Sequence, residues 1–188
     1  MNPNDDTGTG AEAGDIVIRD VTDGDMEAVR EIYSHHVLEG LASFEDDPPD
    51  AAEMTRRRDA LLEEGYPYRV AVQDGRVKGY AYVSSYRPRP AYRHTVETSV
   101  YVDVNTHRQG IGRRLLQDLI EKCTAMGYRQ MVAVIGDTAN QPSIGLHAQQ
   151  GFEVVGTLPS VGYKFGRWVG SVIMQRPLGD GDDILPDG

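Results

Sequence analysis

Hydrophobic and polar residues alternate along the chain with two different periods, and the switches between them predict the order of the elements. Apolar residues at every second position, or unbroken β-branched runs, are typical of strands, whereas apolar residues three and four positions apart are typical of helices. Asp74 and Gly75, between two strand-like runs, are typical of a tight hairpin turn. The sequence predicts strands at 16–21, 69–73, 77–86, 95–104, 130–135, 152–156, 162–165 and 168–174, and helices at 23–38, 51–64, 109–127 and 141 to about 151.

The order of these elements predicts an α/β fold in which helices cover both faces of one sheet. From the N-terminus it is β-α-α-β-β-β-α-β-α, followed by short strands that close the sheet. Antiparallel hairpins come first, and a single crossover helix follows the fourth strand.

The composition is that of an ordinary globular protein with a polar tail at each end. The 188 residues are enough for one domain with a full core, and 39% of them are hydrophobic and 26% charged. Residues 1–14 and 179–188 are acidic and rich in Asp and Gly, so we expect both to be flexible tails. The ordered domain should therefore span residues 15–178.

The formal net charge of −10 argues against a general nucleic-acid-binding protein, which needs clustered Lys and Arg facing phosphates. Basic residues nevertheless gather at 87–93 and 108–114, which favours a local anion-binding pocket. The single cysteine, Cys123, excludes an intramolecular disulfide and a multi-cysteine metal site, and we expect no bound metal. Cys123 falls on the apolar stripe of a predicted helix, so we expect it in the core.

The sequence contains no run of about 18 apolar residues and no hydrophobic signal-peptide region at its N-terminus. We therefore expect a soluble cytoplasmic protein without a membrane partner.

The stretch from residue 95 to 126 combines a strand, a basic glycine-rich turn and a helix. The first N–H groups of a helix lack internal partners, and the aligned peptide dipoles favour an anion there. Two familiar phosphate motifs do not fit: Leu115 stands where the dinucleotide fingerprint needs its third glycine, and the P-loop's Gly-Lys-Ser/Thr is missing. A glycine-punctuated turn that binds nothing remains an alternative.

The loop at 86–94 alternates arginine with proline. Pro88 and Pro90 restrict the backbone while Arg87 and Arg89 project, so two guanidinium groups could hold a carboxylate or phosphinate bidentately. An exposed basic loop without a ligand is the alternative. Phe44 lies in an apolar loop, where it is either a pocket wall or a plug.

Two other polar clusters are interpreted as structural. The run at 56–58 contains three arginines on a predicted helix, and we expect a solvated face there. His35 and His36 are adjacent on a helix and point in different directions, so they cannot chelate one metal from one face. We expect a surface or packing role for this pair.

Between a strand and a helix, the sequence Arg-Gln-Gly-Ile-Gly-Arg at 108–113 resembles the pyrophosphate loop of the GNAT superfamily of N-acetyltransferases. Residues 16–178 resemble more closely the phosphinothricin and methionine sulfoximine/sulfone N-acetyltransferases. This resemblance implies the GNAT fold, a mixed and mostly antiparallel central sheet flanked by helices on both faces. The runs that carry it are 32–37, 42–44, 79–82, 87–92, 97–102, 133–136, 147–152 and 162–168.

The resemblance implies two catalytic residues. Glu97 would be the general base for the substrate amine, which must lose a proton before it attacks a thioester. His147 stands where most superfamily members carry a tyrosine that protonates the departing thiolate, and an imidazole could do this work. Whether His147 acts as acid, second base or positioning group stays open. The alternatives are a cross-strand charge pair at Glu97 and a packed helix histidine at position 147.

The same resemblance implies a set of binding residues. Phe44, Arg87, Arg89 and Tyr92 would hold the amino-acid substrate. Acetyl-CoA would be the co-substrate, with no metal. Its pantetheine and pyrophosphate would be bound by Val100, Tyr101, Val102, Arg108, Gln109, Gly110, Ile111, Gly112, Arg113 and Asn140.

The expected function is direct transfer of acetyl from acetyl-CoA to the α-amine of a small amino-acid analogue such as phosphinothricin or methionine sulfoximine. Two alternatives are a peptide N-terminus or polyamine as acceptor, which Arg87 and Arg89 oppose in the cationic case, and a silent acyl-CoA-binding sensor. The resemblance also implies a homodimer.

Overall fold

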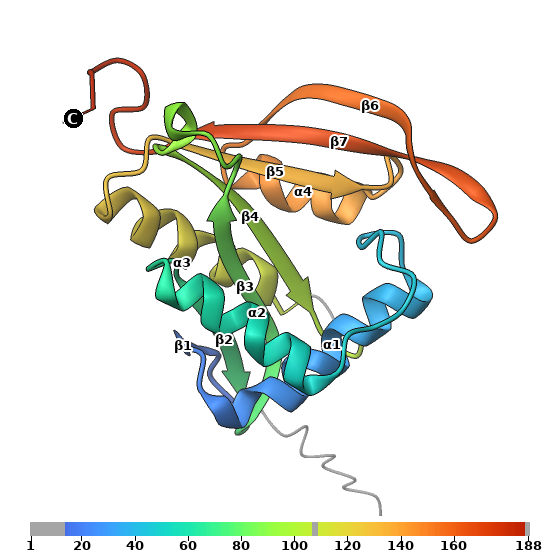
Figure 1. Cartoon of the computed structure of the whole chain (residues 1–188). Helices are drawn as coiled ribbons and strands as arrows, with labels where there is room; N and C mark the ends of the chain where they lie inside the picture. Colours follow the sequence, from blue (N-terminus) through green and yellow to red (C-terminus); the bar gives the residue numbers. More distant parts are fainter. Residues whose placement is uncertain (1–13, 107–108, 187–188) are drawn as a thin grey trace, which may run out of the picture.

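The computed structural model describes residues 14–106 and 109–186. Its centre is a mixed seven-stranded sheet with the strand order β1-β2-β3-β4-β5-β7-β6 (Figure 1). The β4–β5 pair is parallel and the other neighbouring pairs are antiparallel. The strands are β1 (Val17–Asp20), β2 (Tyr68–Gln73), β3 (Arg76–Ser85), β4 (Thr95–Val102), β5 (Gln130–Gly136), β6 (Glu153–Lys164) and β7 (Arg167–Pro177).

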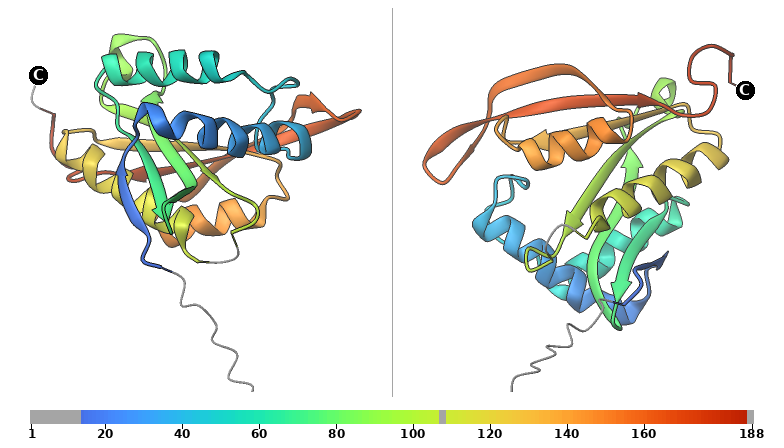
Figure 2. Two further views of the ribbon diagram at one scale, coloured as in Figure 1. Left: turned by 90° about the horizontal axis from the view of Figure 1, so that it is seen from below. Right: turned by 180° about the vertical axis from the view of Figure 1, so that it is seen from behind.

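Helices cover both faces of this sheet, which confirms the predicted architecture (Figure 2). The helices are α1 (Met26–Glu39), α2 (Ala51–Glu63), α3 (Ile111–Ala125) and α4 (Gln141–Gln149), with short 3₁₀ turns η1 (Asp23–Asp25) and η2 (Pro90–Tyr92). None of the helices within residues 14–106 and 109–186 is long and apolar enough to cross a membrane.

Two apolar clusters hold the layers together, one on each face of the sheet. Met26, Val29 and Val37 of α1 pack on the face that carries Tyr68 and Tyr80. On the other face, Leu115, Leu116, Leu119 and Cys123 of α3 are fully buried. Burying one such leucine contributes about 1.5–3 kcal/mol. The core position predicted for Cys123 is confirmed.

Strands β4 and β5 separate halfway along their length. Their pairing starts with Thr95 opposite Gln130 and ends with Thr98 opposite Ala133, although both strands continue within the described residues. Figure 1 shows the two strands starting side by side and then diverging. Beyond Thr98, the facing edges of β4 and β5 therefore share no hydrogen-bond ladder, and the sheet contains a wedge-shaped opening.

The end of the sheet differs from the prediction. Separate strands at 152–156 and 162–165 were expected because glycine and proline interrupt the apolar pattern, and this is wrong: β6 is one continuous strand. Register shifts at 154–156 and 158–162 accommodate these residues, and Ser160 has a φ of 51°. Because β6 is an edge strand, such bulges break pairing on one side only. The β6–β7 hairpin extends beyond the rest of the molecule (Figure 1).

The expectation of a solvated arginine face at 56–58 is also wrong. Successive helical residues point about 100° apart, so three of them cannot share one face. Arg58 is 5% exposed and its guanidinium pairs with Asp23 and Asp59 at 2.7 and 2.6 Å. Arg57 binds the carboxylate of Glu45 at 2.7 Å.

The surface or packing role predicted for the histidine pair is confirmed, because His35 is exposed and His36 packs against β4. His36 Nε2 lies 3.0 Å from the Val102 carbonyl, and its ring lies 5.5 Å from that of Tyr101.

Candidate active site

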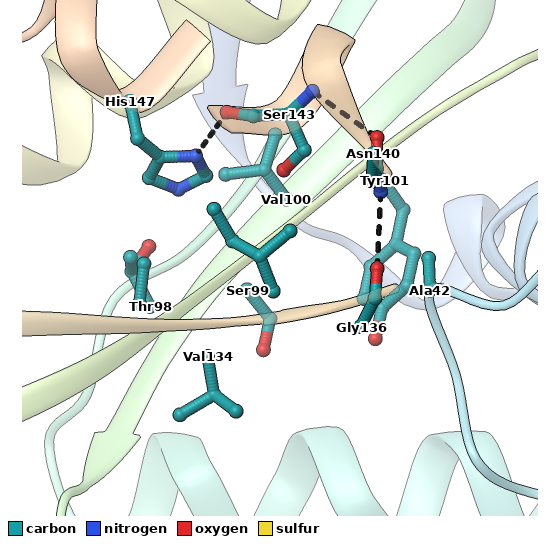
Figure 3. A pocket seen from close by; sticks show the side chains of 12 residues that line it. Ala42, Thr98, Ser99, Val100, Tyr101, Val134, Gly136, Asn140, Ser143 and His147 are labelled. Carbon is teal, nitrogen blue, oxygen red and sulfur yellow. Dashed lines mark hydrogen bonds between the residues drawn. The ribbon is translucent and has the colours of Figure 1, made fainter. Parts of the chain in front are cut away.

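The opening between β4 and β5 forms a small pocket with a cavity volume of about 50 Å³. Both diverging strand ends line it, and the first turns of α4 close one side (Figure 3). A loop between α1 and α2 adds one residue to the wall. The lining residues are Ala42, Thr98, Ser99, Val100, Tyr101, Ala133, Val134, Ile135, Gly136, Asn140, Ser143 and His147.

Glu97 lies on β4 directly before the point of divergence. Side chains alternate along a strand, so Glu97 is on the same face as Tyr101, which packs with α1, while Val96 and Val100 face α3. Burial raises the pKa of the Glu97 carboxyl, and the positive charge of Arg87 partly opposes this. A carboxylate with a raised pKa holds a proton more readily, as a general base must.

His147 lies on α4, on the other side of the opening. The side-chain oxygen of Asn140 caps this helix by accepting from the Ser143 N–H at 3.2 Å. His147 Nδ1 is 2.8 Å from the Ser143 carbonyl (Figure 3). Because a carbonyl oxygen can only accept, Nδ1 carries the hydrogen, and the neutral ring keeps a free electron pair on Nε2.

The surroundings of His147 favour this neutral form. The residue is 4% exposed and its ring contacts Phe152 edge to face at 5.1 Å. Burial lowers the pKa of the imidazole, and the hydrogen bond to the Ser143 carbonyl only partly opposes it. At neutral pH, Nε2 is thus a hydrogen-bond acceptor or a base.

Three polar residues that line this pocket were not predicted from the sequence: Thr98, Ser99 and Ser143. Thr98 is 5% exposed, and its Oγ1 has no hydrogen-bond partner among the described residues. Thr98 directly follows Glu97 on the predicted strand, and neighbouring strand residues lie on opposite faces, so the pattern gave no signal that Thr98 lines the pocket. The point where β4 leaves β5, which puts residues of both faces into one pocket, could not be read from the pattern.

The arginine loop follows β3, and Arg87, Arg89 and Tyr92 are all exposed. The Arg87 guanidinium lies 5.0 Å above the Tyr86 ring, and Tyr92 contacts the same ring edge to face at 5.6 Å. Tyr86, which the sequence analysis did not assign a role, thus orders the loop through cation–π and aromatic contacts. The electrostatic effect of Arg87 on Glu97 connects this loop to the strand.

Phe44 lies in the loop between α1 and α2 and is 41% exposed. Its ring packs against Gly162 of β6 so closely that a Cβ there would lie 2.5 Å from it. The structure therefore brings Phe44 against β6 near the tip of the β6–β7 hairpin.

The turn before α3 has the form expected of an anion-binding helix start. Gly110 has a φ of 75°, in the left-handed region that favours glycine, and the first helical bond runs from Arg114 N–H to the Gly110 carbonyl. The N–H groups of residues 111–113 thus lack partners within α3. Arg113 is exposed, and Ile111 is buried, so only the backbone of Ile111 could contact a ligand.

The other predicted cofactor residues are distributed around this turn and the pocket. Gln109 is exposed, and Gly112 packs against α4, where a Cβ would lie 3.2 Å from Leu146 Cδ2. Val100, Tyr101 and Asn140 line the pocket, whereas the Val102 carbonyl is occupied by His36. Arg108 lies outside the described residues, as does most of the predicted N-terminal tail.

Comparison with known proteins identifies close relatives. The family model described as "Acetyltransferase (GNAT) domain" matches residues 18–173. A phosphinothricin N-acetyltransferase of Alcaligenes faecalis is 51% identical over 170 residues, covering 90% of this chain and 86% of its own. An L-methionine sulfoximine/L-methionine sulfone acetyltransferase of Pseudomonas paraeruginosa is 42% identical over 162 residues, covering 86% and 94%.

A solved structure is similar over most of its length. The phosphinothricin acetyltransferase of Sinorhizobium meliloti, solved in complex with acetyl-CoA, superposes with a TM-score of 0.88 at 44% identity and covers 92% of this chain and 93% of its own. The predicted fold type is confirmed by this match and by the sheet topology.

Proposed function

Because the chain belongs to the GNAT acetyltransferases, we propose that it transfers the acetyl group of acetyl-CoA directly to the α-amine of a small amino-acid analogue, such as phosphinothricin or methionine sulfoximine or sulfone. The observation that carries this proposal is the opening between β4 and β5, with Glu97 on one side of the sheet and His147 on the other. Two reactants can meet in such an opening from opposite faces.

Acetyl-CoA fits the geometry of this opening. The diverging edges of β4 and β5 offer backbone N–H and C=O groups to an extended, amide-containing chain such as pantetheine. The turn at 109–113 lies at the N-terminus of α3 and suits a pyrophosphate, with Arg113, and by prediction Arg108, as additional cations. The Asn140 side chain, whose oxygen accepts from the Ser143 N–H, would contact a pantetheine amide through its remaining hydrogen-bonding groups.

In this proposal Glu97 prepares the nucleophile. An amino acid's α-amine is mostly protonated near neutral pH, so Glu97 accepts one proton, directly or through water, before nitrogen attacks the thioester carbonyl. The nitrogen loses a second proton as the C–S bond breaks and the amide forms. The raised pKa of Glu97 makes its carboxylate a stronger base than that of an exposed glutamate.

The neutral state of His147 favours a role as acceptor. With Nδ1 committed to the Ser143 carbonyl, Nε2 has no hydrogen to give until it has taken one up. We therefore assign His147 to accepting a hydrogen bond or the second proton, after which the imidazolium can protonate the departing thiolate. A backbone N–H at Val100 would stabilise the oxyanion of the tetrahedral intermediate.

The acceptor's anionic groups would be held by Arg87 and Arg89, with Tyr92 as a hydrogen-bond donor and Phe44 as an apolar wall. Two exposed guanidinium groups attract a carboxylate and a phosphinyl oxygen, and they repel a polyamine. A peptide N-terminus as acceptor is the alternative within the same chemistry, and a silent acyl-CoA sensor is the alternative outside it.

We also propose a homodimer that covers the β6–β7 hairpin. This hairpin lies at the sheet edge, and six of its large apolar side chains are 54–66% exposed. Such a patch on a protruding element is typical of an interface. The residues are Val154, Val155, Val161, Tyr163, Phe165 and Trp168. Light scattering of the Trp168→Asp variant should show monomers.

The cytoplasm remains the predicted location of the protein.

The experiment that tests the function measures thiol release from acetyl-CoA with phosphinothricin, methionine sulfoximine, methionine sulfone, an Ala-initiated tripeptide and spermidine. We expect the highest kcat/KM among the first three and the lowest with spermidine. Preference for the tripeptide would favour the peptide alternative, and acetyl-CoA binding without turnover of any acceptor would favour the sensor.

A further inference from the structure

Lys164 is a buried cation that the reaction described above does not use. It is the last residue of β6, at the tip-proximal end of the hairpin, and it is 2% exposed. Its Nζ donates to the carbonyls of Val37 and Ser43, both at 2.7 Å. A buried ammonium is tolerated only where it is hydrogen-bonded, so this side chain joins β6 to the end of α1 and to the following loop.

The loop that Lys164 contacts borders the pocket. Residues 41–45, called the wall segment below, include Ala42, which lines the pocket, and Phe44, the proposed apolar wall for the acceptor. At one end of the segment the fit is tight, since a Cβ on Gly136 of β5 would lie 2.3 Å from the Leu41 carbonyl. Any shift of this segment therefore changes the shape of the pocket.

Two helices hold the other end of the wall segment. The Tyr33 hydroxyl of α1 lies 2.9 Å from Ser43 Oγ and donates to Glu45 Oε1 at 2.9 Å. Arg57 of α2 donates to the same Glu45 oxygen at 2.7 Å. Ser43 Oγ also accepts from the Glu45 N–H at 3.2 Å, so these bonds fix both side chains and backbone.

Strand β6 contacts the wall segment from a third side. Gly162 meets the Phe44 ring, and Lys164, two residues further and on the same face of the strand, bonds the Ser43 carbonyl. The ring contact is not directional, so among the described residues the bond from Lys164 to the Ser43 carbonyl is the polar link between the hairpin and the wall segment, while the second Lys164 bond holds Val37 of α1. Without Lys164 the Ser43 carbonyl loses this donor.

We propose that Lys164 is a positioning residue that holds the wall segment, and with it Phe44, in the shape that binds the amine acceptor. This inference rests on the proposed function, because it assigns Phe44 to the acceptor. Without Lys164, the wall segment would have to be ordered each time the acceptor binds, and the entropy cost of this ordering would weaken acceptor affinity. The turn before α3, which is proposed to bind the cofactor pyrophosphate, would not be affected.

The test compares Lys164→Met, which keeps the length of the side chain and removes its donors, with Lys122→Met in the last turn of α3 as the matched control. We expect Lys164→Met to raise KM for the amino-acid acceptor about fivefold or more and to leave KM for acetyl-CoA within about twofold. Lys122→Met should change neither. Acceptor KM within about twofold of wild type in Lys164→Met would overturn the proposal.

A double variant separates positioning from general damage to the fold. If Lys164 acts through Phe44, Lys164→Met should change acceptor KM by less than about twofold in a Phe44→Ala background. Additive effects would show that Lys164 does not act through Phe44. Should Lys164→Met fail to fold, Gly162→Ala is the second variant, because its new Cβ displaces the Phe44 ring while Lys164 stays. It should raise acceptor KM and leave KM for acetyl-CoA unchanged, and an unchanged acceptor KM would contradict the proposal.

Hydrogen exchange gives a readout that does not depend on activity. The peptide covering the wall segment should exchange about tenfold faster in Lys164→Met than in wild type, with peptides of α3 unchanged. Unchanged exchange would refute the positioning role. If exchange rises but wild-type protein acetylates no acceptor, the proposed function fails while the hold of Lys164 on the segment stands.

Discussion

Replacing Glu97 with glutamine tests the proposed chemistry at its first step. Glutamine has nearly the same shape, and its amide cannot accept a proton from the substrate amine. The side chain lies on β4 at the edge of the pocket and is only partly buried, so the variant should fold. Any loss of activity can then be assigned to the missing base.

The size of the effect follows from what a positioned base contributes. General bases accelerate proton transfer by about 10²–10⁴-fold, which corresponds to about 2.7–5.4 kcal/mol of transition-state free energy. Since burial raises the pKa of Glu97 above its ordinary value of 4.5, the acid limb of the wild-type kcat profile should also lie above that value. We expect kcat of Glu97→Gln to fall by about 10²-fold or more, with KM for acetyl-CoA within about twofold.

Stability should change in the opposite direction to activity. A carboxyl whose folded-state pKa is raised binds more protons in the folded than in the unfolded state, so its contribution is lost as pH rises through the folded pKa. Near neutral pH the ionised Glu97 thus lowers the free energy of unfolding. Glu97→Gln removes this effect, and urea unfolding at pH 7 should show a variant at least as stable as wild type.

The assay is thiol release at saturating acetyl-CoA over a range of pH, with Glu121→Gln on the exposed side of α3 as the matched control. The control should keep wild-type kcat. The reasoning is refuted if Glu97→Gln retains kcat within about twofold of wild type, or if it loses activity only because it unfolds.

Three further outcomes are expected. In His147→Gln, kcat should fall about tenfold or more. In the wild type, kcat/KM should decrease on acidification at a pH below the ordinary histidine pKa of 6.5, because burial lowers the pKa of His147. Steady-state pH profiles of both proteins measure this. Gly110→Ala should lower the free energy of unfolding by about 1 kcal/mol or more, because the φ of Gly110 is positive, although no atom of the described residues lies within 4 Å of the new Cβ. Urea unfolding measures this, and an unchanged stability would contradict it. Arg87→Gln should raise acceptor KM and move the acid limb set by Glu97 to higher pH, because it removes the charge that opposes the raised pKa; Arg93→Gln in the same exposed loop should do neither.

Much of the fold was predictable because its elements carry strong periodic signals. The apolar stripe of α3 and the turn at Asp74 and Gly75 each specify local structure, and the observed elements agree with the predicted ones to within a few residues. The continuous β6 was not predictable, because proline and glycine, here Pro159 and Gly162, usually interrupt a strand. An edge strand can nevertheless include them where its pairing is irregular, as at the register shifts of β6.

The site was predictable in its residue types and less so in its shape. Glu97, His147 and the α3 turn were singled out by sequence. The structure puts His147 in the pocket wall and Glu97 on β4, directly before the pocket residue Thr98. The separation of β4 and β5 depends on long-range packing, so the pocket residues Thr98 and Ser143 carried no local signal. The same holds for Lys164, whose two partners lie more than 120 residues away in sequence.

The central claim is direct transfer of acetyl to the α-amine of an amino acid, and product stoichiometry tests it most directly. With acetyl-CoA and phosphinothricin as the only substrates, released thiol and N-acetylphosphinothricin would be quantified by absorbance and by NMR in the same reaction. The account predicts one N-acetyl product per thiol released, with the acetyl group on the α-nitrogen. Thiol release without an acetylated amine, or no release with any amino acid tested, would contradict it.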